Sequence, residues 1–145
     1  MRKLILAIST ITLAVSAAYA DAISDREAIM KERGQLIGGL AKMAKGEAAF
    51  DAAAVQTALE GLQANEAKFD IAALFPAGSD QGDTEASPKI WEDMAGFQAA
   101  EDKYKAAVAT AASAPAQDVA ALGKQVGELG QGCGGCHEVF RIKKN

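Results

Sequence analysis

The chain has 145 residues, with 2 cysteines, 1 histidine and a formal net charge of -4 at pH 7. This acidic balance argues against nucleic acid and anionic membrane surfaces as partners. Half of the residues are hydrophobic and β-branched runs are rare, so the composition favours helices.

The N-terminal segment has the pattern of a secretory signal peptide. Arg2 and Lys3 precede an apolar run over residues 4–15, and Ala18-Tyr19-Ala20 forms an A-x-A cleavage site. The alternative, an uncleaved membrane anchor, would need about 20 apolar residues, and this run is shorter. We therefore expect residues 1–20 to be cleaved and residues 21–145 to form one exported domain with a net charge of -6.

Two segments in the first half show the helical spacing of apolar residues. The first runs from Ala22 to about Glu47, with Lys45-Gly46 as a stop signal near its end. The second follows Asp51, which suits a helix N-cap. Glu66 interrupts the apolar stripe of the second segment. Residues 70–87 then lose periodicity and are rich in Gly, Pro and Asp, which predicts a long connection.

Two further segments continue the pattern in the second half. Ser87-Pro88 is a strong helix start, and we expect the third helix to turn Met94 inward. The fourth begins near Asp118, and its apolar stripe runs from Val119 to Phe140 through both cysteines. Four helices without a strand pattern predict an all-α fold, an antiparallel up-down-up-down four-helix bundle with its longer link between the second and third helices.

The strongest chemical signal is Cys133-Gly134-Gly135-Cys136-His137, which has the C-x-x-C-H pattern of covalent c-type haem attachment. Two thiols three positions apart lie about one helical turn from each other, so both can reach vinyl groups along one haem edge. The neutral imidazole that follows can bind the iron as the proximal ligand. All cysteines and the single histidine of the chain are used in this motif.

Two other uses of paired cysteines fit less well. A redox-active dithiol is typical of a strand-to-helix junction in a βαβ unit, and the sequence has no strand pattern. A structural zinc site needs four Cys or His ligands, whereas the chain has three such residues. The sequence therefore predicts one covalently attached haem c, held on the inward face of the fourth helix.

The second axial position of the haem iron has several possible occupants. Because there is no second histidine, they are methionine, lysine, water or nothing. Met30 is expected at the level of His137 along the bundle, whereas Met43 would lie roughly 20 Å farther on at ~1.5 Å per residue. Met94 starts the third helix at the same end and is an alternative ligand. Met30 could also be an apolar wall of the pocket that does not bind iron.

A C-x-x-C-H motif near the C-terminus of a four-helix bundle resembles the class II c-type cytochromes, the cytochrome c prime group. The segment from Arg26 to Lys31 resembles the first helix of this family, and Pro88 to Trp91 resembles the start of its third helix. The resemblance covers residues 21–145. It implies a periplasmic monohaem cytochrome with redox partner proteins, and a homodimer formed through the first two helices.

The family resemblance leaves two functions open. High-spin members keep the sixth iron position empty, bind nitric oxide or carbon monoxide, and usually have Arg-Gln where this chain has Arg26-Glu27. Low-spin members fill that position with a methionine and transfer electrons. Our main interpretation is a one-electron carrier with His137 and Met30 as axial ligands; the alternative is a high-spin, gas-binding cytochrome.

The resemblance also implies further residues near the haem. Arg26 and Trp91 match family positions close to the haem propionates, where an arginine can pair with a carboxylate in bidentate fashion. Arg141, one helical turn after His137, either tunes the hydrogen bonding of the imidazole or is a solvated surface charge. No nucleophile, base and oxyanion group cluster outside the motif, so we expect no catalytic residues and no enzyme activity.

Overall fold

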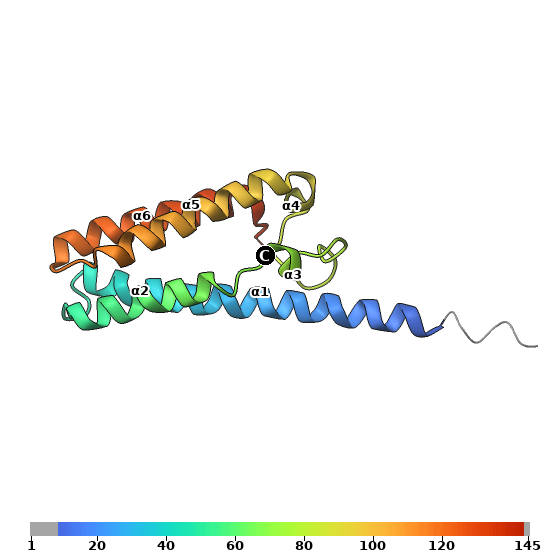
Figure 1. The fold of residues 1–145 in the computed structure, drawn as a ribbon, viewed down its shortest axis with the longest axis horizontal. Helices are drawn as coiled ribbons and strands as arrows, with labels where there is room; N and C mark the ends of the chain where they lie inside the picture. Colours follow the sequence, from blue (N-terminus) through green and yellow to red (C-terminus); the bar gives the residue numbers. More distant parts are fainter. Residues whose placement is uncertain (1–8, 144–145) are drawn as a thin grey trace, which may run out of the picture.

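The computed structural model describes residues 9–143, and all regular elements in that range are helices. Four long helices form the bundle: α1 (Ser9–Ala44), α2 (Ala52–Glu66), α5 (Met94–Ser113) and α6 (Val119–Phe140). Each packs against two others, α1 against α2 and α6, and α5 against α2 and α6, with consecutive long helices antiparallel (Figure 1). The predicted four-helix bundle is confirmed.

The predicted signal peptide lies partly outside the described residues. Arg2 and Lys3 belong to the stretch that is not described, whereas from Ser9 the chain is helical and continues past Ala20 into the bundle. The first part of α1 extends beyond the other helices (Figure 1). Among residues 9–143, no helix is both long and apolar enough to cross a membrane. Cleavage after Ala20 stays a prediction.

The connection between α2 and α5 contains one short helix that we did not predict, α3 (Ile71–Leu74), and a second one, α4 (Lys89–Glu92), at the predicted start of the third helix. The carboxylate of Asp70 accepts two backbone hydrogen bonds at the start of α3. The predicted third helix is split, because the carboxylate of Asp93 accepts a hydrogen bond from the amide of Gly96 at 3.0 Å and caps a new helix there. Local side-chain capping therefore overrides the continuous apolar pattern.

The ends of the long helices follow their capping residues. Asp51 and Asp118 cap α2 and α6 as predicted, each through a carboxylate that accepts backbone hydrogen bonds. After α1, Gly46 has a φ of 74°, a left-handed conformation that glycine adopts without steric cost. The amide of Glu47 then donates to the carbonyl of Lys42 at 2.9 Å, which satisfies a carbonyl of the last helical turn.

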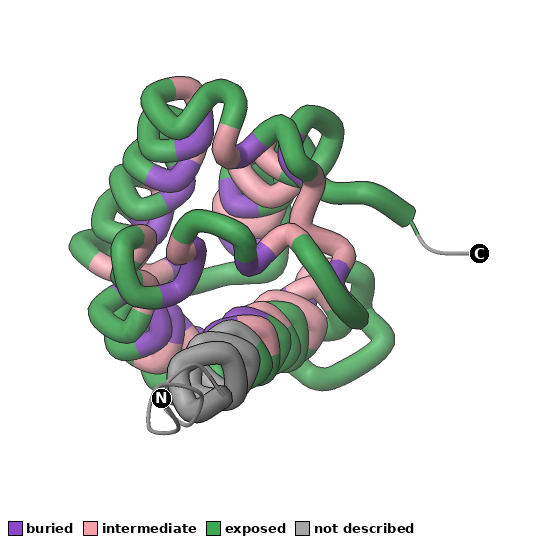
Figure 2. The backbone as a smooth tube through the Cα atoms, turned by 90° about the vertical axis from the view of Figure 1, so that its right-hand side faces the viewer, coloured by how far each residue is buried: buried purple, intermediate pink, exposed green. Residues whose placement is uncertain are grey.

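The buried apolar side chains form two clusters that meet at the cysteines. Cys133 packs against the larger cluster and Cys136 against the smaller one. The purple segments in Figure 2 show that buried residues lie on the inward sides of the helices. The larger cluster is built around Leu40, Val55, Leu59, Leu62, Tyr104, Val108, Leu122 and Leu129. The smaller cluster contains Ile29, Leu74, Phe75, Ile90, Phe97 and Phe140.

Two side chains that we predicted to face inward are exposed. Met94 is 36% exposed and Val119 is 43% exposed. Each is the first residue of its helix, and the buried residues of α5 and α6 begin only at Phe97 and Leu122. The inward-facing stripe therefore starts about one turn later than the apolar pattern indicates.

Gly132 allows α6 to lie close to α5, and its substitution tests this packing. A Cβ at this position would lie 3.1 Å from Cδ2 and 3.4 Å from Cα of Tyr104. Gly132→Ala should lower the free energy of unfolding by about 1–3 kcal/mol, the usual cost of overpacking. The matched control is Gly130→Ala on the same helix, where an added Cβ meets nothing within 4 Å and should stabilise by up to ~1 kcal/mol. Urea unfolding of the holoprotein measures the free energy of unfolding of both variants. Equal changes in the two variants would contradict this packing.

Candidate haem-binding site

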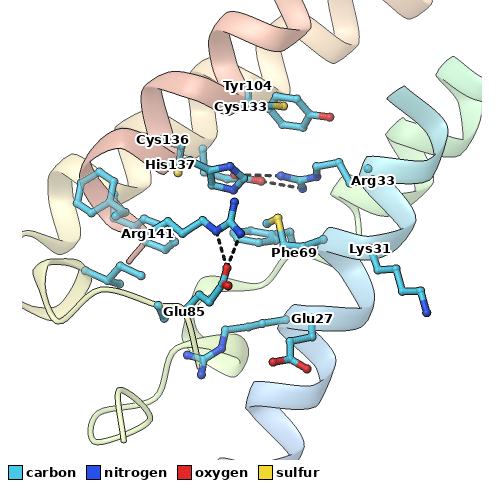
Figure 3. Close-up of a pocket in the computed structure, with 18 of the residues that line it drawn as sticks. Glu27, Lys31, Arg33, Phe69, Glu85, Tyr104, Cys133, Cys136, His137 and Arg141 are labelled. Atoms are coloured by element: carbon cyan, nitrogen blue, oxygen red, sulfur yellow. Dashed lines mark hydrogen bonds and ion pairs between the residues drawn. The ribbon is translucent and has the colours of Figure 1, made fainter. Parts of the chain in front are cut away.

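A cavity of about 720 Å³ lies between α1 and α6, at the boundary of the two apolar clusters. Cys133, Cys136 and His137 line it from α6, and Met30 is among the residues that line it from α1. Figure 3 shows the ring of His137 extending from α6 toward α1. The volume falls within the range of about 300–1,000 Å³ that is usual for ligand and cofactor pockets. The sequence motif and the cavity therefore coincide.

Both cysteines are free thiols and half-buried. Burial raises the pKa of the Cys133 thiol, and it raises the pKa of Cys136 to about 11. Both side chains are therefore protonated at neutral pH, and neither is occupied by another bond. They lie about one turn apart on α6 with their thiols at the cavity wall, the arrangement that attachment of one haem edge requires.

His137 is exposed, and its ring lies at the cavity. The protein around the ring partly desolvates it, and together with the positive charges of Arg141 and Arg33 this lowers the pKa of the imidazole. A lowered pKa favours the neutral imidazole, which is the form that binds iron. The position and the protonation state of His137 both suit a proximal ligand.

Apolar and aromatic groups form much of the remaining wall. Phe97 contacts Phe75 and Phe140 edge to face, with ring centroids 4.8 and 5.2 Å apart. On α1 the wall includes Gly34 and Gly38, and a Cβ added at either would meet nothing within 4 Å. The cavity volume, the paired thiols, the accessible imidazole and these apolar walls fit a covalently bound haem.

Arg26 lines the cavity, but its guanidinium holds the connection between α3 and α4. Its Nη atoms donate to the hydroxyl and carbonyl oxygens of Ser79 at 3.2 and 2.9 Å and to the Thr84 hydroxyl at 3.3 Å. The guanidinium also lies 4.9 Å from the ring centre of Phe75. Burial lowers the pKa of Arg26, and its Nε is buried without a hydrogen-bond partner among the described residues. Contact of Arg26 with a haem propionate stays a prediction.

Of the other predicted haem neighbours, Glu27 lies at the cavity and Trp91 does not. Glu27 lines the cavity and is exposed. Trp91 is not among the residues of the cavity wall, and its indole N–H donates to the carbonyls of Phe75 and Pro76, each at 3.2 Å. Its contact with the haem stays a prediction. Met94 lines a different cavity, so Met30 is the candidate methionine that faces the haem site.

Arg141 lines the cavity and has an acidic partner. Its Nε and Nη2 atoms lie 2.6 and 2.5 Å from Oε2 of Glu85, an ion pair visible in Figure 3. Beside it, the amide of Ile142 donates to the carbonyl of Glu85 and that of Ser87 to the carbonyl of Phe140. The ion pair between Arg141 and Glu85 therefore joins the connection between α2 and α5 to the end of α6. The charge of Arg141 acts on the imidazole of His137 electrostatically.

The sequence did not lead us to a buried charged network on the cavity wall. The guanidinium of Arg33 on α1 lies 2.5 Å from the carboxylate of Glu66 on α2 and 3.1 Å from that of Glu101 on α5. Its Nε donates to Oδ1 of Asn65 at 3.0 Å. Glu66 therefore does not break the inward stripe, as we interpreted it, but belongs to it as an ionic residue.

A signal for this network is present in the helical spacing. Arg33 lies seven residues after Arg26 and seven before Leu40, all of which are buried on one face of α1. Glu101 lies between the buried Phe97 and Tyr104 on α5. Charged residues of opposite sign at core positions of three helices indicate a buried ionic cluster, because an unpaired buried charge is too costly.

The network shifts the ionisation of its members. Burial raises the pKa of Glu66 to about 7, with the charge of Glu101 adding to the rise and that of Arg33 opposing it. Burial also raises the pKa of Tyr104, whose hydroxyl is buried without a hydrogen-bond partner among residues 9–143. Arg33 lies over the ring of Tyr104, 4.4 Å from its centre. One guanidinium therefore pairs with two carboxylates in an apolar wall, and its charge cancels only one of theirs.

The raised pKa of Glu66 predicts the direction of the pH dependence of stability. The pKa rises from 4.5 to about 7 on folding, so between these values the folded chain binds more protons than the unfolded chain. The contribution of Glu66 to the free energy of unfolding therefore falls as pH rises through this window. Glu66→Gln should remove this contribution, whereas the exposed Glu60→Gln on the same helix should keep it. Urea unfolding of the holoprotein at several pH values measures the slope, and an unchanged slope in Glu66→Gln would contradict the assignment.

Comparisons with known proteins decide the family. The family model described as "Cytochrome C'" matches residues 21–141. The chain belongs to the cytochrome c' family. Members of this family carry one covalently attached haem c with its iron. Attachment at Cys133 and Cys136 with His137 as iron ligand stays a prediction.

Relatives and solved structures agree with this assignment. The chain is 44% identical to cytochrome c' of Rhodopseudomonas palustris, over 88% of this chain and 86% of that protein. It is 39% identical to cytochrome c-556 of Agrobacterium fabrum, over 91% and 89% of the two chains. The crystal structure of cytochrome c' from Rubrivivax gelatinosus has a TM-score of 0.77 at 37% identity and covers 86% of this chain and 97% of that one. A nitric oxide complex of a mutant cytochrome c prime from Alcaligenes xylosoxidans has a TM-score of 0.76 at 28% identity, over 87% and 97%.

Covalent attachment can be tested by replacing the two thiols. Holoprotein unfolded in acid should retain its haem through organic extraction, because thioether bonds survive unfolding. Cys133→Ala with Cys136→Ala should release the haem into the organic phase, whereas Gly134→Ala between them should retain it. Absorbance of the two phases measures the partition. Free haem extracted from the unsubstituted protein would contradict attachment at these cysteines.

Proposed function

We propose that this cytochrome binds a small diatomic ligand, such as nitric oxide or carbon monoxide, at the sixth position of its haem iron. It does so in the periplasm, after removal of residues 1–20, as a protein without catalytic residues of its own. This is the gas-binding alternative of the sequence analysis, and it replaces the His/Met electron carrier as the main interpretation.

The open wall of α1 is the observation that carries the proposal. Gly34 and Gly38 line the cavity from the helix that faces His137, and an added Cβ at either meets nothing within 4 Å. The absence of a side chain at these two positions leaves room on that wall for a ligand of two atoms. Lys31, a cavity residue with a nitrogen donor, is exposed and extends away from His137 (Figure 3).

The chain's own residues would orient the cofactor and shield it. When bound, the haem supplies the iron that takes the ligand. His137 would hold the iron from α6, Cys133 and Cys136 would fix the ring to the same helix, and the aromatic wall around Phe97 would exclude water from one side. The nitric oxide complex of the Alcaligenes xylosoxidans protein supports the same ligand class for this chain.

The position of Met30 favours a second candidate function. Met30 lines the cavity from α1, and a thioether is a known axial ligand that raises the reduction potential of haem iron. With Met30 on the iron the protein would be a one-electron carrier for periplasmic redox proteins. A homodimer through α1 and α2 is compatible with either function.

Carbon monoxide binding separates the two candidates. The reduced holoprotein should bind carbon monoxide without any substitution, seen as a change in its visible spectrum. If Met30 holds the sixth position instead, the unsubstituted protein will not bind it and Met30→Ala will. The second result would overturn the proposed function and support the electron carrier.

Filling the open wall of α1 should weaken gas binding. Gly38→Leu places a side chain into the cavity and should lower carbon monoxide affinity by about tenfold or more, which corresponds to ~1.4 kcal/mol. The matched control is Gly39→Leu, on the same helix but not part of the cavity wall, which should leave the affinity unchanged. Spectroscopic titration of the reduced holoprotein measures both variants. Equal affinities would show that the ligand does not bind against α1.

A further inference from the structure

The buried network contains one more carboxylate than it has cations. Arg33, Glu66 and Glu101 come from three different helices, and their side chains are only 8%, 6% and 7% exposed. Asn65 is also buried, accepts from Nε of Arg33 and donates to the carbonyl of Ile29 at 3.0 Å. Packing therefore fixes the geometry of a cluster with a formal charge of -1 when both carboxylates are ionised.

One bound proton relieves the repulsion between the two carboxylates. Both carboxylates contact the same Nη2 atom of Arg33: Oε1 of Glu66 lies 2.5 Å from it and Oε1 of Glu101 lies 3.1 Å from it. Two carboxylates that share one site cannot both ionise at their ordinary pKa, so one of them retains a proton to higher pH. We refer to Glu66 and Glu101 as the carboxylate pair.

The carboxylate pair lies between the haem cavity and a second cavity of about 500 Å³. Glu101 lines both cavities, and Glu66 lines the second. The second cavity also has walls from Asp102 and Lys105, which are exposed residues of α5. The pair therefore borders a cavity with exposed polar walls, while Glu101 also borders the haem cavity.

We propose that the carboxylate pair is a proton-binding site coupled to the oxidation state of the haem. When the iron takes one electron from a one-electron donor and changes from ferric to ferrous, the pair takes one proton from solvent. When the iron returns the electron to an acceptor, the pair releases that proton. The proposal needs only the covalently attached haem and holds for either ligand at the sixth position.

Electrostatics gives the direction of this coupling. Reduction removes one positive charge from the iron, so it raises the proton affinity of buried carboxylates beside the haem cavity. The pKa of Glu66, raised by burial to about 7, brings this exchange close to neutral pH. The titratable and charged groups around the pair are Arg33 on α1, Asp102, Tyr104 and Lys105 on α5, Cys133, Cys136 and His137 on α6, and Asp70 before α3.

The pH dependence of the reduction potential of the holoprotein tests the proposal. In the unsubstituted protein the midpoint potential should fall as pH rises between about 6 and 8. A tenfold difference in proton affinity between the two oxidation states corresponds to a total change of about 59 mV. Glu66→Gln, a neutral isostere that still accepts from Arg33, should make the potential nearly independent of pH in this range. Glu60→Gln, exposed on the same helix, should keep the dependence.

Infrared difference spectroscopy gives a second measurement that does not rely on the folding of one variant. The reduced-minus-oxidised spectrum of the unsubstituted holoprotein near pH 7 should contain a band of a protonated carboxyl group. The band should be lost in Glu101→Gln or Glu66→Gln and retained in Glu60→Gln. The same pH slope in Glu66→Gln as in the unsubstituted protein, or a difference spectrum without a carboxyl band, would overturn the proposal.

Discussion

A flat ring attached at two points on one helix needs a space between helices that side chains do not fill. In this chain the space lies between α1 and α6, and the two apolar clusters end at it from opposite sides. Cys133 packs with one cluster and Cys136 with the other, so the predicted attachment points are held by both halves of the core. The haem and folding are therefore linked, since a haem in this cavity would bury apolar surface only when the chain is folded.

The inner face of α1 carries two buried arginines, and each is stabilised differently. Arg26 is held by neutral oxygens of the connection and by the ring of Phe75. Arg33 is held by two carboxylates and by the rings of Phe69 and Tyr104. The first arrangement fixes a long connection to the bundle. The second places ionisable groups beside the haem cavity, where their charge acts strongly because the surroundings are apolar.

The connection between α2 and α5 closes one side of the site through polar contacts. Trp91 binds the carbonyls of Phe75 and Pro76, and Arg141 pairs with Glu85 where residue 86 meets residue 141 in an isolated bridge. The contacts of Arg141 join segments more than fifty residues apart in the sequence. They explain why a stretch with little periodicity still forms an ordered wall of the cavity.

Patterns within single helices made much of the fold predictable. The apolar spacing indicated the four long helices, and Asp51 and Asp118 marked two of their starts, because a carboxylate that accepts backbone amides acts within three residues. The break at Asp93 has the same physical cause. It went unpredicted because the apolar stripe runs on from Trp91 to Phe97 across the capping residue.

The sequence by itself was enough to predict the haem site, because the chemistry of C-x-x-C-H depends on five adjacent residues and on no distant partner. Only the tertiary structure decided the partners of the charged residues. Glu66 looks like an interruption when α2 is considered alone, and it becomes part of the core once Arg33 from α1 lies 2.5 Å away. Likewise, Arg26 binds Ser79 and Arg141 binds Glu85 across the folded bundle. Spacing along one helix shows which face a residue occupies, but not which group from another helix lies opposite it.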